Sequence, residues 1–132
     1  MNKSQFSVED AEALIPWLEA KFDEMAPVRE GIVREQEELL TLLRQSRGNG
    51  ESSREVELNS MYQAIDRLRF QIQKHLQEVS GRGIIVRDME RGLVDFPSLR
   101  NGREVHLCWV RGEETVGYWH ETDVGFSSRQ PL

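Results

Sequence analysis

The sequence has 132 residues, enough for one domain with a buried core; 30% of them are charged, and the net charge is −6. An acidic surface repels phosphate groups and no basic stripe is present, so the composition argues against binding to nucleic acids or to anionic membranes. No stretch approaches the roughly 18 apolar residues of a membrane span. Cys108 is the only cysteine and no secretory signal is recognisable, which together predict a cytoplasmic, reducing location.

Residues 7–80 predict a long antiparallel helical hairpin. Its first helix covers residues 7–46, and Ser7 is a suitable N-cap because its hydroxyl can accept a hydrogen bond from a free amide of the first turn. Apolar residues then recur every seven positions, as in a helix-packing seam: Leu18, Met25, Ile32 and Leu39. Pro16 is expected to kink or separate the first piece, and Pro27 to bend the helix or divide it in two.

A flexible loop is predicted for residues 46–53, which contain two glycines and small polar side chains. The second helix spans residues 54–80, and its apolar residues keep the seven-residue spacing more regularly: Leu58, Ile65, Ile72 and Val79. Gly81 and Gly83 are expected to end it, because glycine adopts the left-handed conformation of a helix end at little cost.

The pattern then changes to that of extended strands, and residues 83–120 predict a small antiparallel β-meander of three to four strands. Runs rich in β-branched and aromatic residues alternate with turn residues: 84–88, 93–96, 105–110 and 115–120. Pro97 is expected to end the second run because proline cannot donate to a strand ladder. Residues 121–132 are predicted to be a tail, and the whole chain, residues 1–132, a single α+β domain.

One group of side chains in the β-rich half suits metal chemistry: His106, Cys108, His120, Glu121 and Asp123. Thiolate, imidazole and carboxylate are ligands of zinc and iron, so these are the metals that a site here would take. His106 and Cys108 point to the same face of one strand, because side chains alternate. Whether His120 joins them depends on the register of the hairpin around Gly112.

Two registers are open for this hairpin. A loop of two or four residues pairs Val110 with Thr115 and places Cys108 and His120 on opposite faces. A three-residue loop shifts the pairing by one residue and brings His106, Cys108 and His120 to one face. The first register is favoured because it gives a nearly continuous apolar face for packing on helices, which weakens the metal interpretation. That face would contain Val105, Leu107, Trp109, Val116, Tyr118 and His120.

Other candidates carry less specific signals. Trp109 and Trp119 are more typical of packing than of ligand stacking. Asp95 is interpreted either as a solvent-facing strand residue or as a group that orients a neighbouring arginine, and Arg129 either as a clamp for a carboxylate or phosphate or as a surface charge. Phosphate-binding loops, nucleophile elbows and zinc-protease motifs are all missing from the sequence, so no reaction is specified and a non-enzymatic protein is favoured.

Motifs along nearly the whole chain share the pattern of a known family. They are Phe6-Ser7 with Leu14-Ile15-Pro16, residues 83–97, Leu107-Cys108-Trp109 with Trp119-His120, and Gly125-Phe126 with Arg129-Gln130-Pro131. By these motifs the chain resembles the bacterial family catalogued as domain of unknown function 2203. The resemblance implies no activity, cofactor or partner. It implies that a shared site would lie at the matching residues: Cys108, Trp109, Trp119, His120, Gly125 and Arg129.

Two functions from different classes are therefore predicted. The first is an interaction or scaffold module, because two seven-residue seams leave an apolar strip that a small sheet cannot fully cover. Pairing of two hairpins into a homodimer, or docking of another protein, would bury that strip. The alternative is a metal- or small-molecule-binding protein with a site around Cys108 and His120, completed by other candidates of the β-rich half: Trp109, Trp119, Glu121, Asp123 and Arg129.

Overall fold

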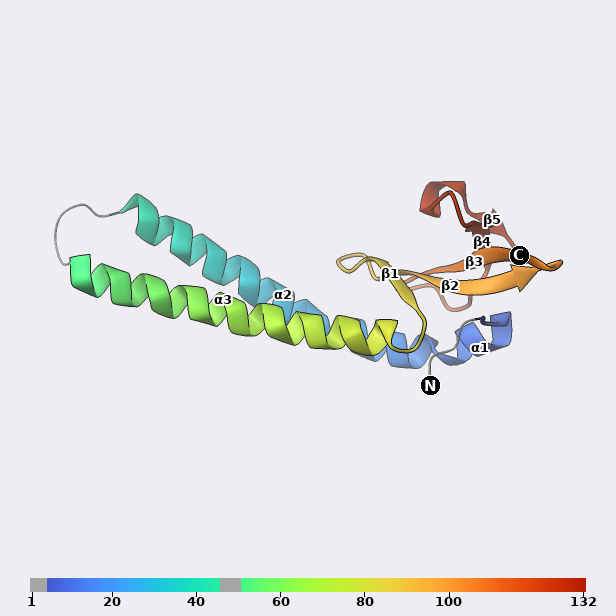
Figure 1. Cartoon of the computed structure of the whole chain (residues 1–132), viewed down its shortest axis with the longest axis horizontal. Helices are drawn as coiled ribbons and strands as arrows, with labels where there is room; N and C mark the ends of the chain where they lie inside the picture. Colours follow the sequence, from blue (N-terminus) through green and yellow to red (C-terminus); the bar gives the residue numbers. More distant parts are fainter. Residues whose placement is uncertain (1–4, 46–50) are drawn as a thin grey trace. The chain divides into compact units, whose positions relative to one another are not determined.

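The structure is a computed structural model that describes residues 5–45 and 51–132 (Figure 1). Within these residues the helices are α1 (Val8–Ala13), α2 (Ile15–Arg44) and α3 (Glu51–Ser80). The strands and a short 3-10 helix follow: β1 (Ile85–Asp88), β2 (Leu93–Arg100), β3 (Arg103–Val110), β4 (Tyr118–Glu121), η1 (Phe126–Ser128) and β5 (Gln130–Pro131). The strands form one antiparallel sheet in chain order, which confirms the α+β class. In the part of the chain described, no helix is long and apolar enough to cross a membrane.

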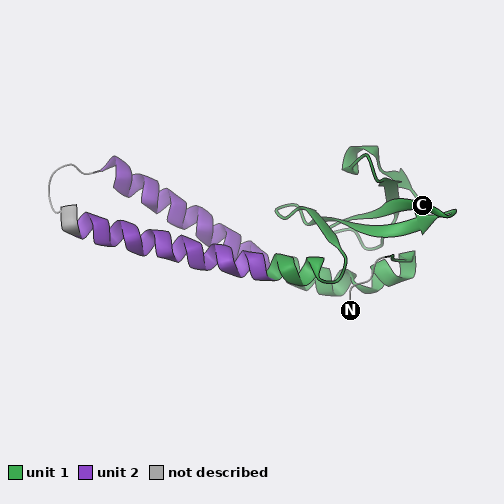
Figure 2. Cartoon of the chain, in the orientation of Figure 1, with its two compact units in different colours: residues 1–23, 75–132 green, residues 24–74 purple. Residues whose placement is uncertain are grey.

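The chain divides into two units, which Figure 2 shows in different colours. Unit 1 contains residues 1–23 and 75–132, and unit 2 contains residues 24–74. The sheet belongs entirely to unit 1, so this unit carries all the residues predicted for a site in the β-rich half.

In unit 2, the seams predicted from the seven-residue spacing are buried only in part, because Ile32, Leu39 and Leu58 are half-buried. Ile65 and Ile72 of α3 are buried. Gly31 of α2 is buried as well, and a Cβ built on it would lie 3.3 Å from the side chain of Leu68. The small residue therefore allows the two helices to approach closely at this level. Residues 46–50 of the predicted loop lie outside the described residues. The prediction of a loop at residues 51–53 is wrong, because α3 already begins at Glu51.

Ser7 begins the helical part of unit 1 as predicted. Its hydroxyl oxygen accepts a hydrogen bond from the backbone N–H of Asp10 at 3.0 Å, and the Asp10 carboxylate accepts one from the N–H of Ser7 at 3.2 Å. This reciprocal capping box satisfies two amides that a helix start otherwise leaves free. α1 ends at Ala13 with Leu14 as its C-cap, and α2 begins at Ile15, next to Pro16, so the expected separation of the first piece is confirmed. At the start of a helix, proline's missing amide costs no helical hydrogen bond.

Of the two alternatives for Pro27, the division of the helix is wrong, because α2 runs through this residue without interruption, and the bend stays a prediction. An interior proline costs roughly 3 kcal/mol, partly through the hydrogen bond lost to the carbonyl four residues before it. That carbonyl belongs to Asp23, an exposed residue that water can reach. Leu18, Phe22 and Met25 on the preceding turns are each at most 2% exposed. Burial stabilises each of them by roughly 1.5–3 kcal/mol, which outweighs the proline.

β2 continues to Arg100, so the prediction that Pro97 ends this strand is also wrong. β1 pairs with β2 only as far as Asp95, and beyond it the N–H of Phe6 donates to the carbonyl oxygen of Pro97 at 2.7 Å. In an antiparallel strand the N–H and C=O of one residue point to the same side. The missing N–H of Pro97 therefore falls on the side that β1 does not reach, and the ladder with β3 stays intact.

The C-terminal residues predicted to be a tail contain η1 and β5. β5 pairs with β4, where Tyr118 faces Pro131 and Trp119 faces Gln130. The described sheet therefore has five strands rather than three to four. A strand of two residues is too short for a period-two pattern to reveal it.

The favoured register of the last hairpin is wrong, and the alternative pairing is the one observed: His106 faces His120 and Cys108 faces Tyr118. The connection, residues 111–117, is longer than the loops considered. Trp119, rather than Tyr118 and His120, completes the apolar face of the sheet. This apolar face carries Val94, Phe96, Val105, Leu107, Trp109 and Trp119. The opposite face, called the polar face below, carries Asp95, His106, Cys108, Tyr118 and His120.

The apolar face packs against the N-terminal segment of unit 1. The ring of Phe6 meets the ring of Phe96 edge to face, with centroids 5.2 Å apart, and both residues are buried. The hydroxyl of Ser98 donates to the carbonyl oxygen of Phe6, and the Glu12 carboxylate accepts from the N–H of Val116 at 3.1 Å. These contacts leave the opposite face of the sheet for polar side chains.

Replacing Ser7 with alanine removes the side-chain acceptor of the capping box. The free energy of unfolding is expected to fall by about 1 kcal/mol. Ser7→Asp keeps an acceptor at the same place and is expected to retain most of the stability. Urea denaturation followed by circular dichroism measures both variants, and equal destabilisation by the two would contradict the role given to the cap.

Candidate functional site

Three neighbouring strands each contribute one side chain to a cluster on the polar face: Asp95 from β2, His106 from β3 and His120 from β4. His106 and His120 face each other across β3 and β4, and Asp95 lies on the next strand, opposite Cys108. One nitrogen of each imidazole and one oxygen of the carboxylate all lie within 4.8 Å of one another. The cluster is therefore a direct product of strand register.

His120 is held in one orientation and is 1% exposed. Its Nδ1 lies 2.8 Å from the backbone carbonyl oxygen of Glu121. Because a carbonyl oxygen can only accept, Nδ1 carries the proton, and in the neutral ring Nε2 then has a free lone pair. Nε2 lies 2.9 Å from Oδ1 of Asp95, which is also an acceptor. Two acceptors at this distance require a proton or a cation between them.

Asp95 is a carboxylate that is 2% exposed. Arg87 donates from Nε to its Oδ2 at 2.8 Å, and Nδ1 of His106 lies 3.6 Å from the same oxygen. A buried carboxylate is costly unless it is paired and hydrogen-bonded. Arg87 therefore supplies a charged hydrogen-bond partner for this carboxylate and fixes the direction of the two oxygens.

The side chain of His106 is 12% exposed, and its Nδ1 is buried without a hydrogen-bond partner among the described residues. Burial lowers the pKa of His106 below its usual value, against the opposing effect of Asp95. The neutral ring is favoured, and a neutral imidazole has a lone pair to offer a metal ion. The rings of His106 and His120 are perpendicular, with centroids 5.5 Å apart.

A cavity of about 280 Å³ lies beside Asp95. Its wall is formed by Arg87, Leu93 and Asp95 on one side and by residues 122–126 on the other. Asp123 belongs to this wall and is exposed. The cavity gives water and small polar solutes a route to the carboxylate of the cluster.

Arg129 ties the C-terminal segment to the polar face. Its guanidinium lies 3.9 Å from the ring centre of Tyr118 and 4.3 Å from that of Phe126. It donates to both carboxylate oxygens of Glu113, at 3.2 and 2.8 Å, and Nη1 lies 3.9 Å from the sulfur of Cys108. A planar guanidinium is suited to this combination of stacking and paired hydrogen bonds. Arg129, which the sequence suggests as a clamp for a carboxylate or phosphate, is therefore already paired with the carboxylate of Glu113.

The structure brings together some of the residues predicted for the site and separates others. On the polar face or beside its cavity lie Cys108, His120, Asp123 and Arg129. On the opposite face lie Trp109, Trp119 and Glu121. Trp109 donates from its indole to the carbonyl oxygen of Glu113 at 2.9 Å, and Glu121 pairs with Arg103 at 2.7 Å. These last residues have local structural partners.

Asp95 is the main site residue that sequence reasoning missed. Its interpretation as a group that orients an arginine agrees with the bond to Arg87, but its place beside two histidines follows only from the register. The available signal was one acidic residue between Val94 and Phe96, in an otherwise apolar run. A charge in the middle of such a run is costly to bury and therefore needs a partner.

Cys108 is fully buried, and burial raises the pKa of its thiol to about 11. We expect a disulfide reagent such as DTNB at pH 8 to label this thiol far more slowly in the native protein than in denaturant, because only the thiolate reacts. Fast labelling of the native wild-type protein would contradict both the burial and the raised pKa.

Comparison with known protein families matches residues 4–132 to one family, described as "Uncharacterized conserved protein (DUF2203)". Neither a curated protein nor a solved structure matches the chain. The match includes every strand that contributes to the cluster, and it confirms the resemblance found in the sequence motifs. The chain belongs to this family of uncharacterised conserved proteins.

Proposed function

We propose that this protein binds a divalent transition-metal ion, with zinc as the first candidate, through Asp95, His106 and His120. The observation that carries the proposal is the pair of facing acceptors: Nε2 of His120, whose ring proton lies on Nδ1, and Oδ1 of Asp95, 2.9 Å apart. A metal ion that both atoms coordinate would remove their repulsion. His106 would supply the third ligand from the neighbouring strand.

The donor set fits such an ion. Two imidazole nitrogens and one carboxylate oxygen are a common ligand set for zinc and for non-haem iron(II). The bond from His120 Nδ1 to a backbone carbonyl, and the bond from Arg87 to Asp95, resemble the outer contacts that orient metal ligands in proteins. Three protein ligands would leave a coordination position for water or a small ligand.

A protonated His120 is the competing explanation for the same geometry. An imidazolium ring would donate from Nε2 to Asp95 and form a buried ion pair with no metal. The two explanations differ in stoichiometric metal content and in the effect of replacing His106, which a simple pair of Asp95 and His120 does not require.

Metal-stripped protein is expected to take up one zinc ion per chain, measured by titration calorimetry and by elemental analysis after desalting. His106→Gln is expected to weaken zinc binding at least about tenfold, since loss of even an outer contact of a metal site costs 10- to 100-fold. His75→Gln is the matched control, because His75 lies on α3 and outside the cluster.

A wild-type chain without stoichiometric zinc or iron would contradict the proposal and favour the buried ion pair. An equal loss of affinity in His106→Gln and His75→Gln would contradict the assignment of the ligands. Zinc at a hundredfold excess over its dissociation constant should also stabilise the folded chain by about 2.7 kcal/mol, as a shift in the urea midpoint.

A second proposal concerns self-association through unit 2, the homodimer expected from the sequence. Several large apolar side chains of this unit are between 43% and 69% exposed: Val33, Leu40, Leu43, Val56, Tyr62 and Phe70. Val33 and Leu40 are seven residues apart, and Val56 and Phe70 fourteen, so each pair lies along one helix face. A second copy of the chain is the occupant proposed for these faces.

Sedimentation at several protein concentrations tests this second proposal. The wild-type chain is expected to form a reversible dimer, and Phe70→Glu is expected to weaken it by about tenfold or more, because a charge would replace a ring that the proposed dimer buries. Val124→Glu is the control, since it adds the same charge at an exposed apolar residue of unit 1. A wild-type chain that stays monomeric, or equal effects of both variants, would contradict the proposal.

A further inference from the structure

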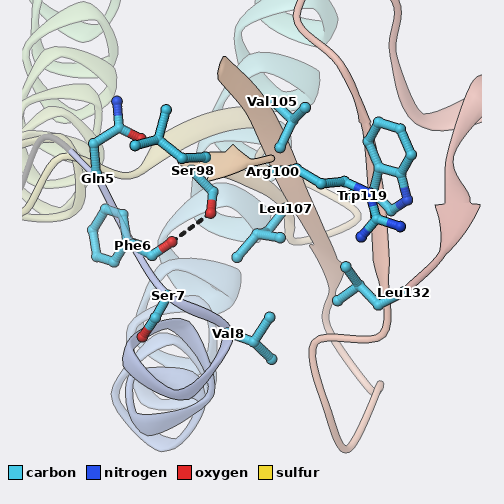
Figure 3. Close-up of a pocket in the computed structure, with 11 residues that line it drawn as sticks. Gln5, Phe6, Ser7, Val8, Ser98, Arg100, Val105, Leu107, Trp119 and Leu132 are labelled. Carbon is cyan, nitrogen blue, oxygen red and sulfur yellow. Dashed lines mark hydrogen bonds between the residues drawn. The ribbon is translucent and has the colours of Figure 1, made fainter. Parts of the chain in front are cut away.

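A second pocket of unit 1 lies on the apolar face of the sheet, away from the histidine cluster. It has a volume of about 430 Å³ and forms where the start of α1 meets β2, β3 and β4 (Figure 3). Its volume is within the range of small-molecule sites, about 300–1,000 Å³. Its apolar wall consists of Phe6, Val8, Leu99, Val105, Leu107, Trp119 and Leu132.

The rim of this pocket includes Leu132, a large hydrophobic residue that is 46% exposed. Leu99 also borders the pocket, but it lies between Ser98 and Arg100 and pairs with Glu104, so its side chain alternates to the polar face of the sheet. Deeper in the pocket, Val105, Leu107 and Trp119 are at most 7% exposed. A ligand with an apolar body would cover Leu132 and contact these three side chains, which favours its entry from water.

Most polar groups of the wall already have partners. The hydroxyl of Ser98 donates to Phe6, and Ser7 is engaged in the capping box of α1. Two groups differ. Oε1 of Gln5 is buried without a hydrogen-bond partner among the described residues, and the guanidinium carbon of Arg100 lies 4.6 Å from the ring centre of Trp119. Figure 3 shows this guanidinium beside the indole, at the edge of the pocket. Its N–H groups therefore lie where they can meet an acceptor on a ligand.

The charge of the side chains that line this pocket indicates which kind of ligand it would bind. Arg100 has the one charged side chain among the eleven residues described as lining the pocket, although the whole chain has a net charge of −6. We propose that this pocket binds a small carboxylic acid with an apolar chain or ring. The carboxylate would pair with Arg100 and the apolar part would lie against Trp119 and Leu107. A guanidinium that is stacked on an indole is well oriented for a carboxylate.

Octanoate and its neutral counterpart octanamide are the probes for this site, and ¹⁵N NMR of the full chain is the readout. Octanoate is expected to shift the indole N–H signal of Trp119 and the amide signals of residues 98–100 in a saturable way. The indole signal of Trp109 should stay in place, because its N–H donates to Glu113 in the core. Arg100→Gln is expected to weaken octanoate binding about tenfold, the cost of losing one charged hydrogen bond, and to weaken octanamide binding clearly less, because an amide oxygen accepts only a neutral-type hydrogen bond.

Two further variants complete the experiment. Arg103→Gln is the matched control, since Arg103 lies on the same hairpin and pairs with Glu121 outside the pocket; it should leave octanoate binding unchanged. Arg100→Lys keeps the charge and should recover part of the affinity. The proposal is overturned by the absence of a saturable shift below the micelle concentration of octanoate, by signals that map elsewhere, or by an equal loss for octanamide. Zinc binding is measured separately, so either site can fail without the other.

Discussion

The pairing of β3 with β4 decides which chemistry each face of the sheet presents. Because side chains alternate along a strand, a shift of one residue would exchange Trp119 with His120. An imidazole would then lie in the apolar core, and an indole would lie beside Asp95. The observed register buries the indole rings of Trp109 and Trp119 on one side and gathers a carboxylate and two imidazoles on the other. The hydrophobic core and the polar cluster therefore depend on the same set of backbone hydrogen bonds.

The polar cluster also contains a buried negative charge, which positive groups of the fold must neutralise. Asp95 is almost fully buried, and Arg87 supplies one positive partner from the side that is partly open to water. The contact with His120 needs a second positive contribution, because the Nδ1 proton of that ring is already committed to a backbone carbonyl. A metal ion and an imidazolium ring are the two ways to provide it. In either case, removing this second positive group would leave a buried charge uncompensated. That loss costs far more free energy than the loss of a surface ion pair.

Local patterns in the sequence predicted the elements that depend on local physics. Propensity and period account for Ser7 as a helix cap, for the buried Ile65 and Ile72, and for the run of extended residues after Gly83.

The predictions that failed have non-local causes. α2 continues through Pro27 because burial of neighbouring side chains exceeds the cost of one proline, and β2 continues through Pro97 because the missing donor faces a side without a strand. The site was only partly predicted, since two registers satisfied the alternation and the choice between them depended on packing across the whole sheet.

Unit 1 is assembled from residues 1–23 and 75–132, with unit 2 inserted between them. The bond from the Phe6 amide to the Pro97 carbonyl is one place where these two distant segments meet. The entropy of closing a chain loop rises only slowly with its length, by about 0.6 kcal/mol for each doubling. The paired helices of unit 2 can therefore gain or lose matched heptads during evolution, as long as the Ile65 and Ile72 seam stays in phase. Neither the histidine cluster nor the apolar pocket would change, so natural variation in the length of the hairpin should be tolerated far better than a single insertion in β3 or β4.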